Sequence, residues 1–244
     1  MKTSNHLLRR LTAALLAAVL ALSIALPVFA SDDGDTIYIN SVSDLLSLAR
    51  SCAYDQWSVG KTVILQKDLS LEGMLWEPIP SFSGQFKGNG HTISDLTITG
   101  QYSPAGLFGI VEEQGSIESL SVRGVVSVSD SADTTTGGIV GINHGTLISC
   151  QFTGVVTGDS EVGGIVGRNE SEGTIDHGTA RAIVTGKSST GGIAGYNLGA
   201  ITGCTNVGSI NTEYPEASLD TDGFTAKMVD YINNKMAAAA DDAT

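Results

Sequence analysis

The sequence predicts an all-β fold, a right-handed parallel β-helix (solenoid) of about six coils with a short capping helix at each end. Three observations carry this prediction: a phrase that returns at a nearly fixed period, short β-type segments between turn residues, and aliphatic residues that align from one repeat to the next. A period of this size marks structural units that bury their apolar faces only by stacking on their neighbours.

The repeated phrase is a glycine pair, Ile, Val or Ala, Gly, a variable residue and Asn. It begins at Gly137, Gly163 and Gly191, with steps of 26 and 28 residues. The paired glycines predict turns with positive φ or a close approach of two backbones. Each phrase ends in an asparagine, Asn143, Asn169 or Asn197. These amides predict a stacked ladder that satisfies turn backbone groups.

Alignment of the repeats predicts a core of aliphatic columns. The first contains Leu107, Ile139, Ile165 and Ile193, the second Leu147, Ile175 and Ile201 with Ile117 joining them, and the third Val156, Val184 and Ile210. A buried aliphatic side chain contributes about 1.5–3 kcal/mol, so such columns can fill a narrow tube without many aromatic residues. The short β segments from residue 61 onward match one coil per repeat better than the denser hairpins of a sandwich.

The segments outside the repeats have separate assignments. Residues 1–30 have the basic start, apolar run and small-residue end of a signal peptide, with a lone membrane anchor as the alternative. Residues 31–59 are expected to form a strand and a capping helix, because Ser41 and Asp44 make a helix-start pattern before the stripe Leu45, Leu48, Ala49 and Cys52. The β-helix is then expected over residues 60–212.

Residues 213–244 are predicted to form a C-terminal cap helix and a disordered tail, because Phe224, Met228, Tyr231 and Ile232 lie at helical spacing. Equally, this segment could be an excursion before further coils of a longer protein. Two insertions are predicted to be outward loops, Glu170–Glu172 and Ser129–Thr136. Insertions that leave a stack undisturbed are places where recognition often occurs.

Composition limits the partners. The formal net charge is −13, and it becomes −16 when the basic residues of the signal peptide are removed. A surface this acidic repels phosphate, so no nucleic-acid partner is expected. The spacings of Cys and His suggest no metal site or other cofactor. Cys150 and Cys204 are expected two coils apart, about 9.6 Å, and therefore as free inward thiols.

The chain resembles a known family at two kinds of motif. The phrase from Phe82 to Ile93, which includes Gly84-Gln85-Phe86-Lys87-Gly88-Asn89-Gly90, is similar to the opening coil of bacterial surface and secreted β-helix proteins, and the glycine-pair repeats resemble the GLUG motif. The resemblance covers roughly residues 36–212 and implies a pectin-lyase-like right-handed β-helix. Some members carry such repeats beside adhesin modules or IgA-cleaving peptidase domains. The motif has no catalytic residues that could be transferred to this chain.

The candidate chemistry is weak by itself. Clustered carboxylates and a base would suit a polysaccharide lyase or glycosidase. The acids considered are Asp130, Asp133, Asp159 and Glu161, and the cations are Arg168, Arg181 and Lys187. Solvated turn residues explain them better, and structural hydrogen bonds explain His91, His144 and His177 better. Trp57, Trp76, Tyr102 and Tyr196 are the candidate sugar-stacking aromatics, with Trp76 assigned to sealing the first coil and Tyr196 expected to be the best exposed.

These observations favour a secreted or cell-surface bacterial module that is more a binder than an enzyme and is not an integral membrane protein after signal cleavage. The expected role is adhesion, with a glycan or a host extracellular-matrix protein as partner. No catalytic residue is assigned. The proposed ligand-binding residues are Tyr196, Asp130, Asp133, Glu170 and Glu172. A small polysaccharide lyase or glycosidase and a structural spacer in a larger surface protein remain as alternatives.

Overall fold

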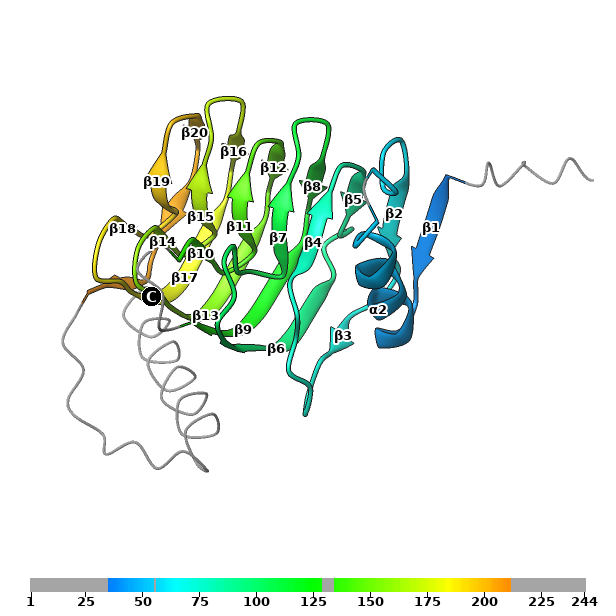
Figure 1. The fold of residues 1–244 in the computed structure, drawn as a ribbon, viewed down its shortest axis with the longest axis horizontal. Helices are drawn as coiled ribbons and strands as arrows, with labels where there is room; N and C mark the ends of the chain where they lie inside the picture. The colour runs from blue at the N-terminus through cyan, green and yellow to red at the C-terminus, as the bar shows by residue number, and fades with distance from the viewer. Residues whose placement is uncertain (1–34, 55, 129–133, 212–244) are drawn as a thin grey trace, which may run out of the picture. The chain divides into compact units, whose positions relative to one another are not determined.

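The computed structural model describes residues 35–54, 56–128 and 134–211 (Figure 1). Within these residues the chain forms an all-β parallel solenoid of about six coils, so the predicted fold class is confirmed. The predicted signal peptide (1–30), the C-terminal cap helix (213–244) and the loop residues Asp130 and Asp133 lie outside the described residues.

Four stacks of parallel strands build the coils. Sheet A contains β1 (Thr36–Ile39), β2 (Thr62–Leu65), β5 (Gln85–Lys87), β8 (Ser116–Glu118), β12 (Thr146–Ile148), β16 (Thr174–Asp176) and β20 (Ala200–Thr202). Sheet B contains β3 (Leu69–Ser70), β6 (Thr92–Gly100), β9 (Ser121–Val128), β13 (Gln151–Thr157), β17 (Thr179–Thr185), β21 (Thr205–Asn206) and β22 (Ser209–Ile210).

The remaining strands form sheets C and D. Sheet C contains β4 (Ile79–Phe82), β7 (Phe108–Val111), β11 (Val140–Asn143), β15 (Val166–Asn169) and β19 (Ala194–Asn197). Sheet D contains β10 (Thr136–Gly137), β14 (Val162–Gly163) and β18 (Thr190–Gly191). A complete coil runs through sheets D, C, A and B in that order, and Figure 1 shows the sheet C strands side by side.

The predicted aliphatic columns are confirmed by the strand register. Leu147 pairs with Ile117 on one side and Ile175 on the other, and Ile175 pairs with Ile201. Val156 pairs with Val184, which pairs with Ile210. The Ile139 N–H donates to the Ile165 carbonyl, and the Ile165 N–H donates to the Ile193 carbonyl. These columns stack along the inside of the tube, where most of their members are fully buried.

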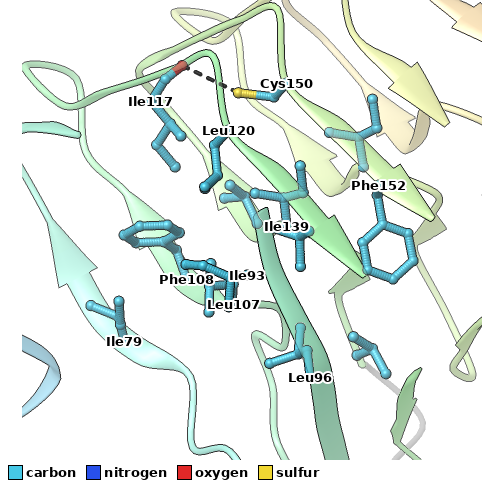
Figure 2. Close-up of a cluster of buried hydrophobic side chains, with 14 of the residues drawn as sticks. Ile79, Ile93, Leu96, Leu107, Phe108, Ile117, Leu120, Ile139, Cys150 and Phe152 are labelled. Carbon is cyan, nitrogen blue, oxygen red and sulfur yellow. Dashed lines mark hydrogen bonds between the residues drawn. The ribbon is translucent and has the colours of Figure 1, made fainter. Parts of the chain in front are cut away.

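The core changes in character along the stack. The early coils contain a packed aromatic group, Phe82, Phe86 and Phe108, with ring centroids 5.4–6.3 Å apart. Figure 2 shows Phe108 and its register partner Ile79 in the same buried group as Leu107 and Ile93, with Phe152 farther along the stack. The later coils pack smaller aliphatic residues against glycine backbones, which accounts for the dense core with few aromatics.

A helix covers the first coil, as predicted. Helix α2 (Val42–Ser51) begins after Ser41, whose Oγ accepts the Asp44 N–H at 3.2 Å, while the Asp44 carboxylate accepts the Asn40 N–H at 2.9 Å. Leu45, Leu48 and Cys52 are buried in the same apolar cluster as the coils. The capping interactions satisfy N–H groups at the start of the helix, and the stripe closes the first coil.

The glycine pairs are places of close backbone approach and are absent from the positive-φ residues among those described. A Cβ at Gly138 would meet the Phe152 ring, and one at Gly164 would meet the Gly192 carbonyl oxygen of the next coil. Of the two predicted reasons for these glycines, close approach is therefore confirmed. Positive φ occurs at another turn, between sheets A and B.

That turn stacks residues of left-handed conformation in successive coils. Asn89, Ser119, Ser149 and His177 have φ of 52°, 53°, 53° and 51°, and Gly203 has φ of 62°. The N–H groups of Ser119, Ser149 and His177 each donate to a carbonyl of the following coil. Hydrogen bonds between coils thus stabilise a conformation that residues other than glycine adopt infrequently.

The turns between sheets C and A alternate in length. Two residues connect the strands at Ser83-Gly84, His144-Gly145 and Leu198-Gly199, whereas four connect them at Glu112–Gly115 and Glu170–Gly173. The two longer turns share a hydrogen bond, from Gly115 N–H to the Glu112 carbonyl and from Gly173 N–H to the Glu170 carbonyl. The predicted insertion at Glu170–Glu172 is a loop, but an earlier coil carries its counterpart.

The predicted amide ladder is confirmed. Asn143 Nδ2 donates to Asn169 Oδ1 at 2.7 Å, and Asn169 Nδ2 donates to Asn197 Oδ1 at 2.8 Å. The same amides bind their own turns, with Asn143 donating to the Gly145 carbonyl and Asn169 to the Gly173 carbonyl. Asn143 and Asn169 are fully buried. The ladder satisfies buried turn groups that would otherwise have no partner.

All three cysteines are free, which confirms the prediction for Cys150 and Cys204. Cys150 and Cys204 lie in one inward column with Gly178 between them, because the residues that follow them, Gln151, Thr179 and Thr205, are paired in register. The Gly178 N–H donates to Cys204 Sγ at 3.2 Å. Burial raises the pKa of Cys150 to about 12 and that of Cys52 to about 11, so both thiols are held neutral.

Candidate functional site

The candidate site lies on the outer face of sheet C near the last coils. Arg168 and Tyr196 are partners in register on β15 and β19, so their side chains stack on the same outward column. The guanidinium carbon of Arg168 lies 4.9 Å from the centroid of the Tyr196 ring. Arg168 Nη1 contacts Glu161 Oε1 at 2.8 Å, and Arg168 Nε contacts Glu170 Oε1 at 2.6 Å. Glu161, Arg168, Glu170 and Tyr196 are named here the Arg168 cluster.

Different elements position the members of this cluster. Glu161 precedes β14 and its Oε2 accepts from Thr135 Oγ1 at 3.1 Å, which ties it to the neighbouring coil. Glu170 begins the four-residue turn after β15, and its N–H donates to the Asn143 carbonyl. Two adjacent coils and one longer turn therefore place two carboxylates around a single guanidinium.

The electrostatics of the cluster favour a permanently charged cation. Partial burial opposes the charged form of Arg168, but the hydrogen bond to Glu170 and the charges of Glu161 and Glu170 outweigh it and raise the pKa of Arg168. Arg168 cannot then act as a proton acceptor. A cation over an aromatic face is also favourable, by about 0.5–2 kcal/mol.

The structure brings together part of the predicted ligand-binding set. Tyr196 and Glu170 meet through Arg168. Glu172 has a different partner, because its Oε2 accepts from Ser171 Oγ at 2.7 Å, and this hydrogen bond lowers the pKa of its exposed carboxyl group. Asp130 and Asp133 lie outside the described residues. The other two members of the cluster, Arg168 and Glu161, were considered in the sequence as possible catalytic residues and not as ligand-binding ones.

The other charged residues considered for catalysis form separate contacts. Lys187 Nζ pairs with Asp159 Oδ1 at 2.6 Å, and the lysine side chain is highly exposed. Arg181 lies in an outward column on β17, in register with Thr153 and Arg123. Among the residues that the structure describes, no three His, Cys, Asp or Glu side chains gather as metal ligands.

Two of the three histidines for which structural hydrogen bonds were predicted, His91 and His177, make such contacts. His91 Nδ1 lies 3.2 Å from Asp68 Oδ1, and the same carboxylate accepts the Thr92 N–H at 2.9 Å. The backbone hydrogen bond, followed by that from His91, lowers the pKa of Asp68. His177 Nδ1 lies 2.9 Å from Asp176 Oδ1 in the left-handed turn. His144 is half-buried.

The aromatic residues do not form an exposed row among those described. Trp76 is buried, as expected, and its Nε1–H donates to the Leu107 carbonyl at 3.1 Å. Trp57 and Tyr102 are half-buried, so Tyr196, 38% exposed, is the most exposed of the four aromatics considered. The expectation for Tyr196 among these four candidates is therefore confirmed, but two other tyrosines are more exposed, Tyr54 at 75% and Tyr38 at 46%. Neither tyrosine lies in the repeats, where the sequence signal was sought.

The fold and this cluster define a parallel β-solenoid with an ordered polar patch on one face. No known protein-family profile matches the chain. It is 30% identical over 155 residues to halomucin of Haloquadratum walsbyi, a match that covers 58% of this chain and 2% of halomucin. It is 29% identical over 137 residues to a candidate Gly-rich membrane protein of Evansella cellulosilytica, covering 41% of this chain and 16% of that protein.

One solved structure is similar in fold. It is the crystal structure of a candidate immunoglobulin A1 protease from Bacteroides ovatus, with a TM-score of 0.45 and 15% identity over 76% of this chain and 80% of the other. The described residues contain no helix of the length and apolar character needed to cross a membrane. This chain spans only a small part of the two sequence relatives.

Proposed function

We propose that this chain is an exported, non-catalytic solenoid module of a cell-surface protein, and that the Arg168 cluster is its recognition surface for a glycan or an extracellular-matrix protein. One observation carries the proposal. The outward charged residues nearest to an enzyme-like grouping are Glu161, Arg168 and Glu170. Arg168 pairs with both carboxylates, and its guanidinium lies over the Tyr196 ring. Such a patch presents a fixed shape to a partner and has no free base.

The pKa shifts of the carboxyl groups support binding over hydrolysis. A glycosidase needs one carboxylic acid whose pKa is raised, so that it holds a proton at neutral pH. Within the described ranges, the carboxyl groups whose pKa is shifted are Asp44, Asp68 and Glu172, and all three are lowered, each chiefly by a hydrogen bond from a backbone N–H or a hydroxyl group. Lowered values favour permanent carboxylates, which accept hydrogen bonds from ligand hydroxyls.

The sequence relatives support the module. Segments similar to this chain make up a small share of halomucin and of the Gly-rich membrane protein, so related segments occur inside much longer chains. Export and surface attachment remain part of the proposal. The acidic net charge of −13 favours neutral or cationic partners over sulfated or phosphorylated ones.

Binding to an array of glycans and matrix proteins tests this function. The full chain is expected to give at least one hit that weakens roughly tenfold or more when Tyr196→Ala or Arg168→Gln removes the ring or its cation. Tyr54→Ala is the matched control, since it removes a more exposed tyrosine far from the repeats. Equal loss in the control would place the binding surface elsewhere. A parent protein that binds nothing would favour the spacer, and release of unsaturated or reducing sugars would favour the enzyme.

A further inference from the structure

The last coil of the solenoid leaves its core open. Ile175 is fully buried, whereas Ile201, its partner in the same inward column, is 38% exposed. Val184 is fully buried, whereas Ile210 beside it is 40% exposed. Side chains that point into the tube are exposed here because no described residue packs beyond them. A contiguous apolar end of this kind marks an interaction surface.

The hydrogen-bonding groups at the outer edge of the last coil also lack partners in a further coil. Asn143 and Asn169 each donate twice, to the next asparagine and to a turn carbonyl. Asn197 accepts from Asn169, but among the described contacts its amide donates only to the Gly199 carbonyl. The last strands of sheets A to D have a neighbour on one side only. Open strand edges next to an apolar surface invite pairing with another chain unless they are covered.

The first coil shows how this molecule covers such an end. Helix α2 places Leu45, Leu48 and Cys52 over the core, at helical spacing. A second stripe of the same kind follows the last coil in the sequence, at Phe224, Met228, Tyr231 and Ile232. Successive members of this stripe are four, three and one positions apart in the sequence. Residues at this spacing share one side of a helix.

We infer that the open end binds the chain's own segment 213–235 through the stripe Phe224, Met228, Tyr231 and Ile232. The segment starts where it is needed, because Asn211 still donates from its N–H to the Val184 carbonyl in the last coil. About twelve residues separate Asn211 from Phe224, and at about 3.3 Å per residue they reach across the end of a coil with length to spare. The open end of the last coil is distinct from the Arg168 cluster, so the inference does not depend on the proposed recognition surface.

Cys204 supplies the reporter for a test in the full chain. Its thiol lies in the inward column of the last coil, accepts the Gly178 N–H and is only half-buried, whereas Cys150 lies two coils deeper and is buried. The measurement is the rate at which an aromatic disulfide reagent labels each thiol at neutral pH. Cys150 stays protected as long as the solenoid is folded, so it controls for unfolding.

The variant pair separates the stripe from the added charge. Phe224→Asp with Met228→Asp disrupts the stripe, and Ala226→Asp with Asn233→Asp puts the same charge on the opposite side of the expected helix. Cys204 labelling is expected to accelerate at least about tenfold in the first variant and to stay near the parent rate in the second, because only the first loses the docked segment.

Three outcomes would overturn the inference. Equal labelling rates in parent and stripe variant would show that the segment does not cover Cys204. Equal acceleration in both variants would show an effect of charge alone. A parent that sediments as a dimer, with Cys204 protection that rises with protein concentration, would make a second copy the occupant of the open end.

Discussion

One register position of sheet C holds apolar residues in the early coils and asparagines in the later ones. Phe82, Val111, Asn143, Asn169 and Asn197 follow one another in register on sheet C. The first two add apolar volume, and the last three form the amide ladder. The spacing of the asparagines predicted the ladder. The two apolar members were not foreseen, because their coils lack the complete glycine phrase.

Asn169→Ala tests the ladder. The change removes the partner of Asn143 Nδ2 and the donor to both Asn197 Oδ1 and the Gly173 carbonyl. Buried groups left without partners cost about 1–3 kcal/mol, so the urea midpoint is expected to fall. Asn197→Ala, at the exposed end of the ladder, should cost less. A midpoint for Asn169→Ala equal to that of the parent would contradict the ladder's role.

Ile165→Asp tests the inward column. It places a charge inside the tube at a fully buried position and is expected to lower the free energy of unfolding by more than about 4 kcal/mol. Glu172→Ala, in the outward turn, is the comparison, since Glu170 makes an ion pair and is less suitable. Indistinguishable urea midpoints would refute the assignment of the column.

The buried thiol predicts a fall in stability at alkaline pH. The pKa of Cys150 is about 12 in the folded chain and 9.0 for an ordinary thiol, so above pH 9 the unfolded state loses this proton first. The free energy of unfolding therefore decreases as pH rises from 9 to 12, by up to about 1.4 kcal/mol per pH unit from this group. Cys150→Ala should show a shallower decrease over the same interval. Parallel pH profiles for the two proteins would argue against a buried neutral thiol.

The inward residues of the strands and the helix were predictable from the sequence, whereas the conformation of the turns was not. Periodic aliphatic residues and the Ser41–Asp44 pattern predicted the strands' inward residues and helix α2, because burial and capping impose regular spacing. The left-handed turn at Ser119, Ser149 and His177 was missed, since residue type gives little signal there. The pairing of Arg168 with Tyr196 was missed as well, because it depends on which outward side chains meet on adjacent coils.

Deletion of Ser171 and Glu172 together tests the alternation of turns. It converts the four-residue turn into the two-residue form already present at His144-Gly145, so strand register is kept. The expected change in stability is below about 1 kcal/mol, since shorter loops close at little entropic difference. Deletion of Ser171 alone leaves a three-residue turn that no described coil has, and it should destabilise the fold much more. Equal melting temperatures for the two deletions would count against this account.

The charge of the whole molecule acts on every coil. Twenty-six acidic residues face 13 basic ones, and the described ion pairs neutralise only a few of them. Repulsion between the remaining carboxylates opposes the compact state more than the unfolded one. Charge is thus a cost to stability that salt can reduce.

The free energy of unfolding is expected to rise, by on the order of 1 kcal/mol, when NaCl is raised from about 0.01 M to about 0.1 M, because the screening length falls from about 30 to 10 Å. Urea titrations at the two salt concentrations measure this change. Sodium sulfate is unsuitable as the added salt, since it also strengthens apolar burial. Stability that stays constant or declines with NaCl would show that net repulsion is unimportant.

The alternating turn lengths imply that the natural unit of growth is a pair of coils. Short turns at Ser83-Gly84, His144-Gly145 and Leu198-Gly199 flank the long ones at Glu112–Gly115 and Glu170–Gly173. Inserting or deleting one coil inside the stack would place two turns of equal length next to each other, either two acidic four-residue turns or two two-residue turns. Adding or losing two coils would preserve the alternation, the parallel register and the spacing of carboxylates. A solenoid of this kind can therefore lengthen by two coils at a time and keep the same alternation of turns along its edge.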